Sequence, residues 1–414
     1  MIPTIIEDVR ARKVLDSRGN WTIEVDVITD YAIGRCAAPS GASTGKYEAR
    51  AFPDGGVEKA IVEVEETIAP ELRGMDSINQ EEVDRTLHEI DGTDNFSSIG
   101  GNTAVAVSLA NAKAAAASHG LPLFQFLGGN FSCELPYPLG NVIGGGAHAS
   151  NATTIQEFLV IPVGARDIAE AICTNAEVHK KLRDELTKRC GNLGKGDEGA
   201  WAPAMSDEEA LQALTRVCDL VEQETGVKLR LGLDVAASQF WNEKKQRYVY
   251  GDGRELTPEQ QVEYIASLIE DYQLYYVEDP VQEEDFETFA ELTSRVRALI
   301  CGDDLYVTNV DRLRRGIQRS STNAVLIKPN QCGTLTDTFK AIKLAMNEKL
   351  VPVISHRSGE TTDETIAHLA VAFSIPIIKT GVIGGERIAK LNELIRIAEE
   401  LTPSRARLAR LPKV

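Results

Sequence analysis

The 414-residue sequence lacks the marks of several classes of protein. Its seven cysteines are scattered and include no Cys-X-X-Cys pair, so we expect free thiols in a reducing cytoplasm. Residues 1–8 contain no basic segment followed by an apolar core, which argues against a signal peptide. The alanine-rich run 102–117 contains Asn111 and Lys113 and is too short to span a bilayer.

Basic residues are also in short supply. Lys and Arg number 44 against 62 Asp and Glu, which gives a formal charge of −18. This balance argues against nucleic acid as the primary partner and against an anionic membrane surface. An anionic substrate would be repelled by such a protein unless cations lie at its binding site.

The composition and length are those of a folded protein of two domains. Hydrophobic residues make up 43% of the chain and charged residues 26%. A chain of this length suits a barrel of roughly 250 residues plus a smaller domain. The connector Leu135-Pro136-Tyr137-Pro138 places the boundary near 134, so we predict domains at 1–134 and 135–414.

The first domain is expected to combine strands and helices. Residues 2–38 are typical of extended segments, with clean alternation over 23–27. Helices are expected over 57–68, 79–90 and 103–118. Between them lies Ser40-Gly41-Ala42-Ser43-Thr44-Gly45, six small residues in a row, which suit either a flexible linker or a mobile lid over a ligand.

The second domain carries a repeat. Three short apolar runs end at Glu278, Asp303 and Lys328, with spacings of 303−278 = 25 and 328−303 = 25. Two later runs end at His356 and Lys379, after 28 and 23 residues (356−328 and 379−356). Strand-like runs at this interval, separated by helix-like segments, indicate repeated βα units. We predict an α/β barrel whose chemistry lies at the carboxyl ends of its strands.

The remaining barrel elements follow the same pattern. We expect a strand over 157–162, a strand over 229–233 that ends on Asp234, and a helix over 258–271 with Thr257 as its N-cap. Further helices are expected over 167–186, 206–224 and 387–401.

Three acids at predicted strand ends, Asp234, Glu278 and Asp303, point to a metal. Close carboxylates would force one another to become protonated unless a cation lies between them. Oxygen ligands without histidine or cysteine suit Mg²⁺ better than Zn²⁺. For any single acid, an N-cap or a solvated surface position is the commoner role, but three in register with a lysine favour the metal.

Lys328 and Lys379 follow on later strands. A lysine at a strand end is usually a surface charge or a phosphate contact. Near a divalent metal and a second cation, its pKa can fall from about 10.4 towards neutrality, as a general base requires. The segment His356 to Thr361, with Arg357 and Ser358, suits a phosphate or a carboxylate.

Two other motifs are weak by themselves. The acid pair Asp197-Glu198 lies in a glycine-flanked loop, and such loops are common. His148 ends the Gly-rich segment 141–148, and a lone histidine is more often structural than catalytic.

Taken in order, several segments resemble the signature segments of the enolase family from about residue 5 to the C-terminus. The ending 382–387 resembles archaeal members. The segments are Ser17-Arg18-Gly19-Asn20, Ser40 to Gly45, Gln156-Glu157-Phe158, Gly196 to Gly199, Glu278-Asp279-Pro280, Gly302 to Leu305, Lys328 to Gln331, Ser355 to Thr361 and Lys379-Thr380-Gly381.

The resemblance implies a TIM-type (β/α)₈ barrel of the enolase variant, preceded by a smaller α+β capping domain with a lid loop. It implies reversible, Mg²⁺-dependent dehydration of 2-phospho-D-glycerate to phosphoenolpyruvate, a step of glycolysis and gluconeogenesis. A lysine base beside Mg²⁺ is the known chemistry of this superfamily. Two Mg²⁺ ions per active site, a phosphorylated small-molecule substrate, a homodimer or larger homo-oligomer and a cytoplasmic location are implied with it.

Roles for individual residues come from the same resemblance. Lys328 would take the proton from C2, and Glu198 would protonate the hydroxyl that leaves C3. Asp234, Glu278 and Asp303 would hold the first Mg²⁺, and Ser43 would join the second when the loop closes. The substrate-binding residues would be His148, Gln156, Glu157, His356, Arg357, Ser358 and Lys379, with Arg357 and Ser358 on the phosphate and Lys379 near the carboxylate.

Two alternatives stay open at this point. One is another acid-sugar dehydratase, racemase or cycloisomerase of the enolase superfamily, which would share the metal acids but would not need both the small-residue loop and Arg357-Ser358. The other is a non-catalytic binding protein with the same fold. The sequence also departs from the family pattern at Gly144 and at Ala200-Trp201, close to Glu198, which could alter the rate of reaction.

Overall fold

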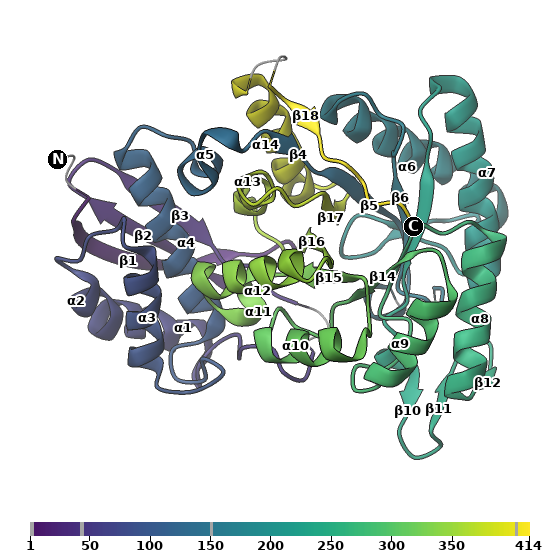
Figure 1. Ribbon diagram of the computed structural model, residues 1–414, viewed down its shortest axis with the longest axis horizontal. Helices are drawn as coiled ribbons and strands as arrows, with labels where there is room; N and C mark the ends of the chain where they lie inside the picture. The colour runs from purple at the N-terminus through teal and green to yellow at the C-terminus, as the bar shows by residue number, and fades with distance from the viewer. Residues whose placement is uncertain (1–3, 42–44, 150–151, 402–404) are drawn as a thin grey trace.

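The computed structural model describes residues 4–41, 45–149, 152–401 and 405–414. It consists of two parts that lie side by side (Figure 1). A sheet with helices, in purple and blue, is formed by the first third of the chain. A barrel surrounded by helices is formed by the remainder, as the βα repeat predicts.

The first part is built on a three-stranded antiparallel sheet of order β1-β2-β3. Helix α4 packs directly on β2 and β3. A Cβ added at Gly34 of β3 would lie 2.0 Å from the carbonyl oxygen of Ala110, so only glycine allows this approach. The elements are β1 (Ile6–Leu15), β2 (Trp21–Thr29), β3 (Ile33–Ala37), α1 (Gly56–Glu63), η1 (Val64–Ile68), α2 (Ala69–Leu72), α3 (Gln80–Asp91), α4 (Gly101–Ser118), α5 (Leu123–Gly128) and η2 (Gly129–Phe131).

The helices expected here are present, with one difference. α3 and α4 match the predicted ranges within two residues at each end. The helix expected over 57–68 begins as α1 but continues as the π-helical segment η1 and then as α2. Nothing in the hydrophobic pattern signals this wider turn.

Eight strands form a closed barrel in the second part. Their order is β5-β6-β9-β13-β14-β15-β16-β17, and β17 pairs back onto β5. All neighbours are parallel except β6, which runs antiparallel to both β5 and β9. The strands are β5 (Tyr137–Gly144), β6 (Glu157–Ile161), β9 (Arg230–Asp234), β13 (Tyr276–Glu278), β14 (Leu299–Gly302), β15 (Ala324–Ile327), β16 (Val351–Ser355) and β17 (Ile377–Gly381).

Successive residues of the barrel strands face opposite sides. In β15, Ala324 and Leu326 pack in the barrel interior, whereas Val325 and Ile327 belong to the larger core that includes the helices. Because both faces are covered by apolar residues, each strand is a continuous apolar run. This is why the strands could be found from short apolar segments.

The helices around the barrel begin at well-defined caps. Thr257 accepts a hydrogen bond from the Gln260 N–H, as predicted, and Ser206 forms the same capping box with Glu209. The helices are α6 (Ile168–Cys190), α7 (Asp207–Thr225), α8 (Pro258–Asp271), α9 (Phe286–Arg295), α10 (Val310–Arg319), α11 (Pro329–Cys332), α12 (Leu335–Asn347), α13 (Thr365–Ala372) and α14 (Gly385–Glu400).

Short elements complete the chain. They are β4 (Glu134–Leu135), η3 (Gly146–His148), β7 (Gly194–Lys195), β8 (Trp201–Ala202), η4 (Ala237–Phe240), β10 (Trp241–Asn242), β11 (Arg247–Val249), β12 (Glu255–Leu256) and β18 (Arg407–Leu408).

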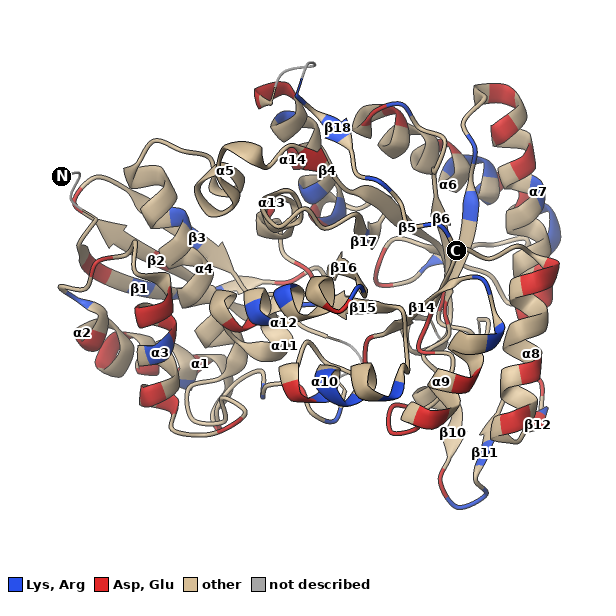
Figure 2. Ribbon diagram, in the orientation of Figure 1, with Lys and Arg blue, Asp and Glu red and all other residues tan. Residues whose placement is uncertain are grey.

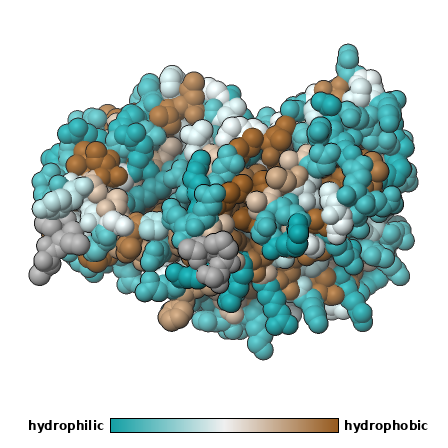
Figure 3. Space-filling view, turned by 90° about the horizontal axis from the view of Figure 1, so that it is seen from above, coloured by the Kyte–Doolittle hydropathy of each residue, from teal (hydrophilic) through white to brown (hydrophobic). Residues whose placement is uncertain are grey.

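The surface is mainly polar and acidic. Figure 2 places acidic residues along α7 and α8, and Figure 3 shows hydrophobic residues scattered over a largely hydrophilic face. Of the helices that the structure describes, none has the length and apolar character needed to cross a membrane.

Candidate active site

One rim of the barrel collects the predicted acids. Asp234 and Glu278 are the last residues of β9 and β13, and Asp303 directly follows β14. Glu157 is the first residue of β6, yet it reaches the same rim because β6 runs antiparallel. The site therefore uses the amino end of one strand and the carboxyl ends of its neighbours.

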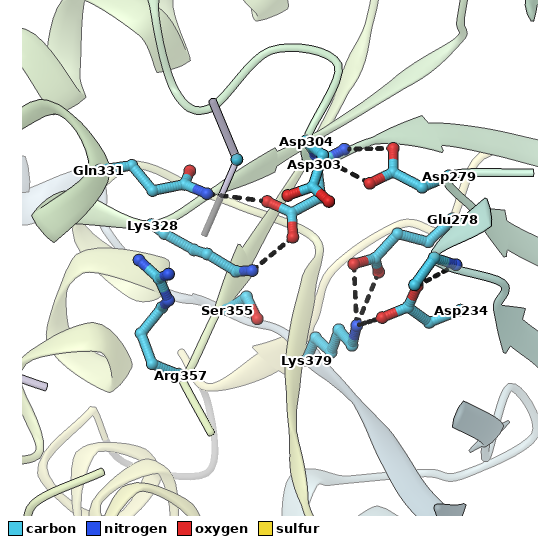
Figure 4. A network of polar contacts seen from close by, with 12 residues as sticks. Asp234, Glu278, Asp279, Asp303, Asp304, Lys328, Gln331, Ser355, Arg357 and Lys379 are labelled. Atoms are coloured by element: carbon cyan, nitrogen blue, oxygen red, sulfur yellow. Dashed lines mark hydrogen bonds and ion pairs between the residues drawn. The ribbon is translucent and has the colours of Figure 1, made fainter. Parts of the chain in front are cut away.

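Lys379, from the middle of β17, lies between Asp234 and Glu278 (Figure 4). Its Nζ is 2.9 Å from Asp234 Oδ2 and 2.8 Å from Glu278 Oε2, and it forms a further ion pair with Glu157 at 3.2 Å. Burial alone would disfavour the ammonium, but these carboxylates raise the pKa of Lys379 well above its usual value. Lys379 is therefore a fixed positive charge.

Lys328 follows β15 and pairs with Asp303 (Figure 4). Gln331 donates a second hydrogen bond to Asp303, at 3.0 Å. Although burial opposes it, the Asp303 carboxylate raises the pKa of Lys328 above 10.5. The predicted fall of this pKa towards neutrality refers to Lys328 beside a bound divalent cation, and it stays a prediction.

Asp279 is a site residue that sequence reasoning did not single out. Its two carboxylate oxygens accept the N–H groups of Asp303 and Asp304, at 3.0 and 2.8 Å. Asp279 has φ of +41°, a left-handed conformation that costs energy for any residue but glycine. It belongs to the Glu-Asp-Pro segment of the sequence, so the segment carried the signal even though no role was assigned to it.

The carboxylates could hold a divalent cation by their chemistry. Among the described residues, two compact sets have ligand atoms within 4.8 Å of one another: His148-Glu157-Glu198 and Asp279-Asp303-Asp304. The predicted trio of Asp234, Glu278 and Asp303 is not such a set. Lys379 lies between Asp234 and Glu278, and Asp303 faces Lys328.

Negative charge exceeds positive charge at this rim. Burial and the neighbouring Asp234 raise the pKa of Glu278 to about 8, in spite of Lys379. Seven buried acids at or beside the rim (Glu157, Glu198, Asp234, Glu278, Asp279, Asp303 and Asp304) meet four buried cations (Lys328, Arg357, Lys379 and Arg387). Oxygen donors with unbalanced charge fit a hard divalent cation such as Mg²⁺.

Glu198 faces the same cavity from the turn between β7 and β8. Asn141 Nδ2 donates to Glu198 Oε2 at 3.0 Å, and His356 Nε2 lies 3.2 Å from the same oxygen. His148 Nε2 is 3.9 Å from Oε1. Although burial opposes it, His356, His148 and Arg387 hold the pKa of Glu198 well below its usual value. Asn141 was not predicted, because it lies inside β5 with no motif around it.

The segment after β16 joins the two parts of the molecule. The Arg357 guanidinium pairs with Glu48, at 2.9 and 3.1 Å, and donates to Asn330 Oδ1 at 2.8 Å. Glu48 comes from the first part, and no feature of the sequence linked it to this site. Ser358 lines the cavity beside Arg357.

The remaining predicted residues have the following places. Gln156 donates to Asp234 Oδ2 at 3.1 Å and is buried. Ser43 lies outside the described residues, whereas Gly41 lines the cavity.

In the unusual pair Ala200-Trp201, the tryptophan side chain contacts His179. The Trp201 indole N–H donates to the carbonyl of His179 at 2.8 Å, and its ring stacks on the His179 ring at 4.9 Å. A Cβ at Gly144 would lie 3.5 Å from the Ala200 Cβ, so the two departures pack against each other.

All predicted site residues within the described ranges, except Glu278, line one cavity, and Glu278 joins it through Lys379. This cavity measures about 20 Å³, because the lysine–carboxylate pairs fill most of the rim. A larger hollow of about 680 Å³ lies at the opposite end, lined by residues just before β13 and β14. The chemistry favours the small cavity as the active site, because the titratable groups converge there.

Two comparisons identify the family. Residues 6–127 match the family described as "Enolase, N-terminal domain", and residues 132–409 match "Enolase, C-terminal TIM barrel domain". The chain is 60% identical over 412 residues to an enolase of Methanosphaera stadtmanae, covering 98% of this chain and 100% of the relative.

Two further enolases are nearly as similar. One, from Methanothermobacter thermautotrophicus, is 58% identical over 99% of both chains. The other, from Archaeoglobus fulgidus, is 55% identical over 95% of this chain and 97% of its own length. All three sources are archaeal, as the ending 382–387 predicts. With both enolase domain models matched and 60% identity to a curated enolase over nearly the whole chain, the protein belongs to the enolase family.

Proposed function

We propose that the protein catalyses the reversible dehydration of 2-phospho-D-glycerate to phosphoenolpyruvate, as a hydro-lyase of glycolysis and gluconeogenesis. The observation that carries the proposal is the shared cavity of a buried lysine, Lys328, and a buried acid, Glu198. Removal of a C2 proton and loss of a C3 hydroxyl need a base and an acid that both reach one small substrate. The full-length similarity to enolases supports this over another reaction of the superfamily or a purely binding role.

Asp234, Glu278 and Asp303 would hold one Mg²⁺, and Ser43 would join a second, so that each active site takes two. A bound divalent cation supplies positive charge beside the substrate carboxylate, where negative charge builds up as the C2 proton leaves. The excess of buried carboxylates at the rim supports a divalent cation there.

Lys328 is the base in this proposal. Its Nζ can accept the C2 proton only when the amine is neutral. The charge of Asp303 opposes the neutral form. Arg357 and Lys379 act in the other direction, since both lower the pKa of Lys328. Burial, Arg357 and Lys379 therefore favour the neutral amine that takes the proton, whereas Asp303 and Glu278 oppose it.

Glu198 acts on the C3 oxygen. Its low pKa makes it ionised at rest, which suits the hydration direction, in which it accepts a proton from the incoming water. In the dehydration direction it must first carry a proton and then donate it to the leaving hydroxyl. A buried carboxylate beside two imidazoles has the neighbours needed to exchange that proton.

The substrate would be held by charges already at the rim. Arg357 and Ser358 would bind the phosphate, which would compete with Glu48 for the guanidinium. Lys379 would lie near the carboxylate, and His148, Gln156, Glu157 and His356 would complete the pocket.

The test is direct. The protein is mixed with 2-phosphoglycerate and Mg²⁺, and the ultraviolet absorbance of the enol product is followed. Turnover that EDTA abolishes is expected; no signal, or a signal that EDTA leaves unchanged, contradicts the proposal. Lys328→Ala should remove turnover with an unchanged circular dichroism spectrum, and the exposed Lys343→Ala on α12 is the matched control.

We also propose the domain division 1–134 and 135–414, a homodimer or larger homo-oligomer, and a cytoplasmic location. The first barrel strand begins at Tyr137, which supports the division. The seven cysteines are free, which fits a reducing compartment. Light scattering of the purified protein tests the oligomer: a monomeric mass would contradict it.

A further inference from the structure

Arg387 is a fully buried arginine in the first turn of α14, with no exposed surface. Its two terminal nitrogens reach three segments of the active-site rim. Nη1 donates to the carbonyl of Arg357 at 2.5 Å, and Nη2 donates to the carbonyls of Ser358 and Asp197 at 2.6 and 3.2 Å. One side chain thus joins the loop after β16 to the loop that carries Glu198.

The Arg387 guanidinium also determines the tautomer of His356. Arg387 Nη1 lies 2.8 Å from His356 Nδ1. A guanidinium has only donors, so Nδ1 must accept with its lone pair. The backbone N–H of Gly381 also points to Nδ1, at 3.4 Å. The ring proton of neutral His356 is therefore on Nε2.

Nε2 lies beside the acid. His356 Nε2 is 3.2 Å from Glu198 Oε2, close but off the ideal hydrogen-bond direction. Burial and the charge of Arg387 together lower the pKa of His356 to about 4, against the attraction of Glu198. The ring is thus neutral near pH 7, and its tautomer decides whether a donor or a lone pair faces Glu198.

Close packing around Gly381 restricts the positions of Arg387 and the Glu198 backbone. A Cβ at Gly381 would lie 2.3 Å from the carbonyl oxygen of Glu198 and 3.1 Å from Arg387 Cγ. The Arg387 stem and the Glu198 backbone therefore both approach Gly381 where a side chain would otherwise lie. Arg387 Nε faces Glu386 at 3.3 Å, which balances part of the buried charge.

We infer that Arg387 is a positioning residue that fixes His356 as the Nε2–H tautomer and so presents an N–H donor to Glu198. The inference rests on the proposed function for the role of Glu198, but the tautomer does not. Arg387 touches neither Lys328 nor the three metal-binding acids in the contacts of the described residues.

Other charged groups also surround Glu198 and His356. Glu198 is faced by His148, by Glu157 from β6 and by Lys379 from β17. His356 is faced by Glu198, Arg387 and Glu360. Of these groups, Arg387 is the one that contacts Nδ1, so its removal acts on the tautomer first.

The experiment reads the tautomer by nitrogen NMR on the full-length protein labelled with ¹⁵N-histidine. The chain has six histidines, and the His356 signals are assigned by their loss in His356→Asn. We expect the Nε2–H tautomer in the unchanged protein. A wild-type ring that is Nδ1–H or doubly protonated near neutral pH overturns the inference without any Arg387 variant.

Arg387→Met should convert His356 to a mixture of tautomers, and Arg387→Lys, which keeps a donor, should restore the Nε2–H form. The matched control is Lys390→Met. Lys390 is equally buried one turn along α14, and its Nζ binds Thr361 O and Glu360 at 2.7 and 2.8 Å without touching His356. Unchanged tautomers in Arg387→Met, or the same change in Lys390→Met, overturn the inference.

Kinetics give a second readout. We expect Arg387→Met to lower kcat by about 10- to 100-fold, the range found when a group that orients another is removed. The pH profile should move to higher pH by roughly one unit, because His356 and Arg387 both lower the pKa of Glu198. An unmoved profile with a lowered kcat contradicts the positioning role. If the unchanged protein shows no turnover, the proposed function fails, and NMR still decides the tautomer.

Discussion

Glu157 and Asp234 are register partners on the antiparallel strands β6 and β9, and both contact the ammonium of Lys379. Glu157 begins its strand and Asp234 ends its own, so two opposite strand directions deliver carboxylates to one point. Glu278 reaches the same ammonium from β13. Lys379 is therefore the cation shared by three buried carboxylates of the rim.

Lys379→Met should destabilise the protein strongly. It leaves three buried carboxylates without their shared cation, and loss of one partner of a buried ion pair costs about 3–5 kcal/mol. Urea unfolding measures the change, with the exposed Lys343→Met as control. Added Mg²⁺ should recover more stability in the variant than in the unchanged protein. Equal Mg²⁺ effects would contradict the view that a cation can take over this charge.

Tyr276→Phe should weaken metal binding. The buried Tyr276 hydroxyl donates to Glu278 Oε2 at 2.6 Å and so orients a proposed ligand. A lost hydrogen bond to a charged group costs about 1.5–3 kcal/mol. Removal of a ligand's hydrogen-bond partner lowers metal affinity by about 10- to 100-fold. Calorimetry with Mg²⁺ measures the affinity.

The neighbouring tyrosine is the control for that variant. The Tyr275 hydroxyl donates to the carbonyl of Pro412 instead. Tyr275→Phe should leave Mg²⁺ affinity unchanged, and a similar loss in both variants would mean that the effect is general to the barrel core.

Gly381→Ala should disturb the acid loop. The added Cβ would meet the Glu198 carbonyl oxygen at 2.3 Å, and such overpacking costs about 1–3 kcal/mol. We expect a lower thermal midpoint together with a lower kcat. Gly385→Ala is the control, since nothing lies within 4 Å of its added Cβ. A Gly381→Ala enzyme with full activity would contradict the close approach.

His88→Gln should reduce stability in acid more than in alkali. His88 of α3 and Asp337 of α12 form an ion pair of 2.6 Å between the two parts of the molecule. Asp337 raises the pKa of His88 above 6.5, so this contribution is complete below 6.5 and is lost as pH rises through the folded pKa. Burial opposes the shift at Asp337, but His88 lowers its pKa to about 2.

The contribution of Asp337 is therefore present above 3.8 and is lost as pH falls towards 2. The difference in free energy of unfolding between His88→Gln and the unchanged protein should be largest between these limits, near pH 5.5. It should be small at about pH 9. Because the His88 side chain is 44% exposed, we expect about 1 kcal/mol or less. Urea unfolding at both pH values measures it, with His119→Gln as control. An equal difference in free energy of unfolding at both pH values would contradict a stabilising ion pair between His88 and Asp337.

Much of the architecture could be predicted from short-range pattern. The recurring apolar runs that end at Glu278, Asp303 and Lys328 predict the strands and their common rim, because a buried parallel strand is apolar on both faces. The small-residue segments and strand-end residues also carry the resemblance to the family. Those signals are local, since each depends on residues that are neighbours in the chain.

The sequence by itself determined which strand-end acids and lysines reach the rim and which strands carry them. Only the tertiary structure decided which groups meet. It turned β6 antiparallel, so that Glu157 joins Asp234, and it brought Glu48 to Arg357, Asn141 to Glu198 and Arg387 to His356. The contact between Lys328 and Asp303 was likewise decided by the fold, since no spacing of 25 residues specifies it. These contacts join segments far apart in the chain, and barrel closure and domain packing set them.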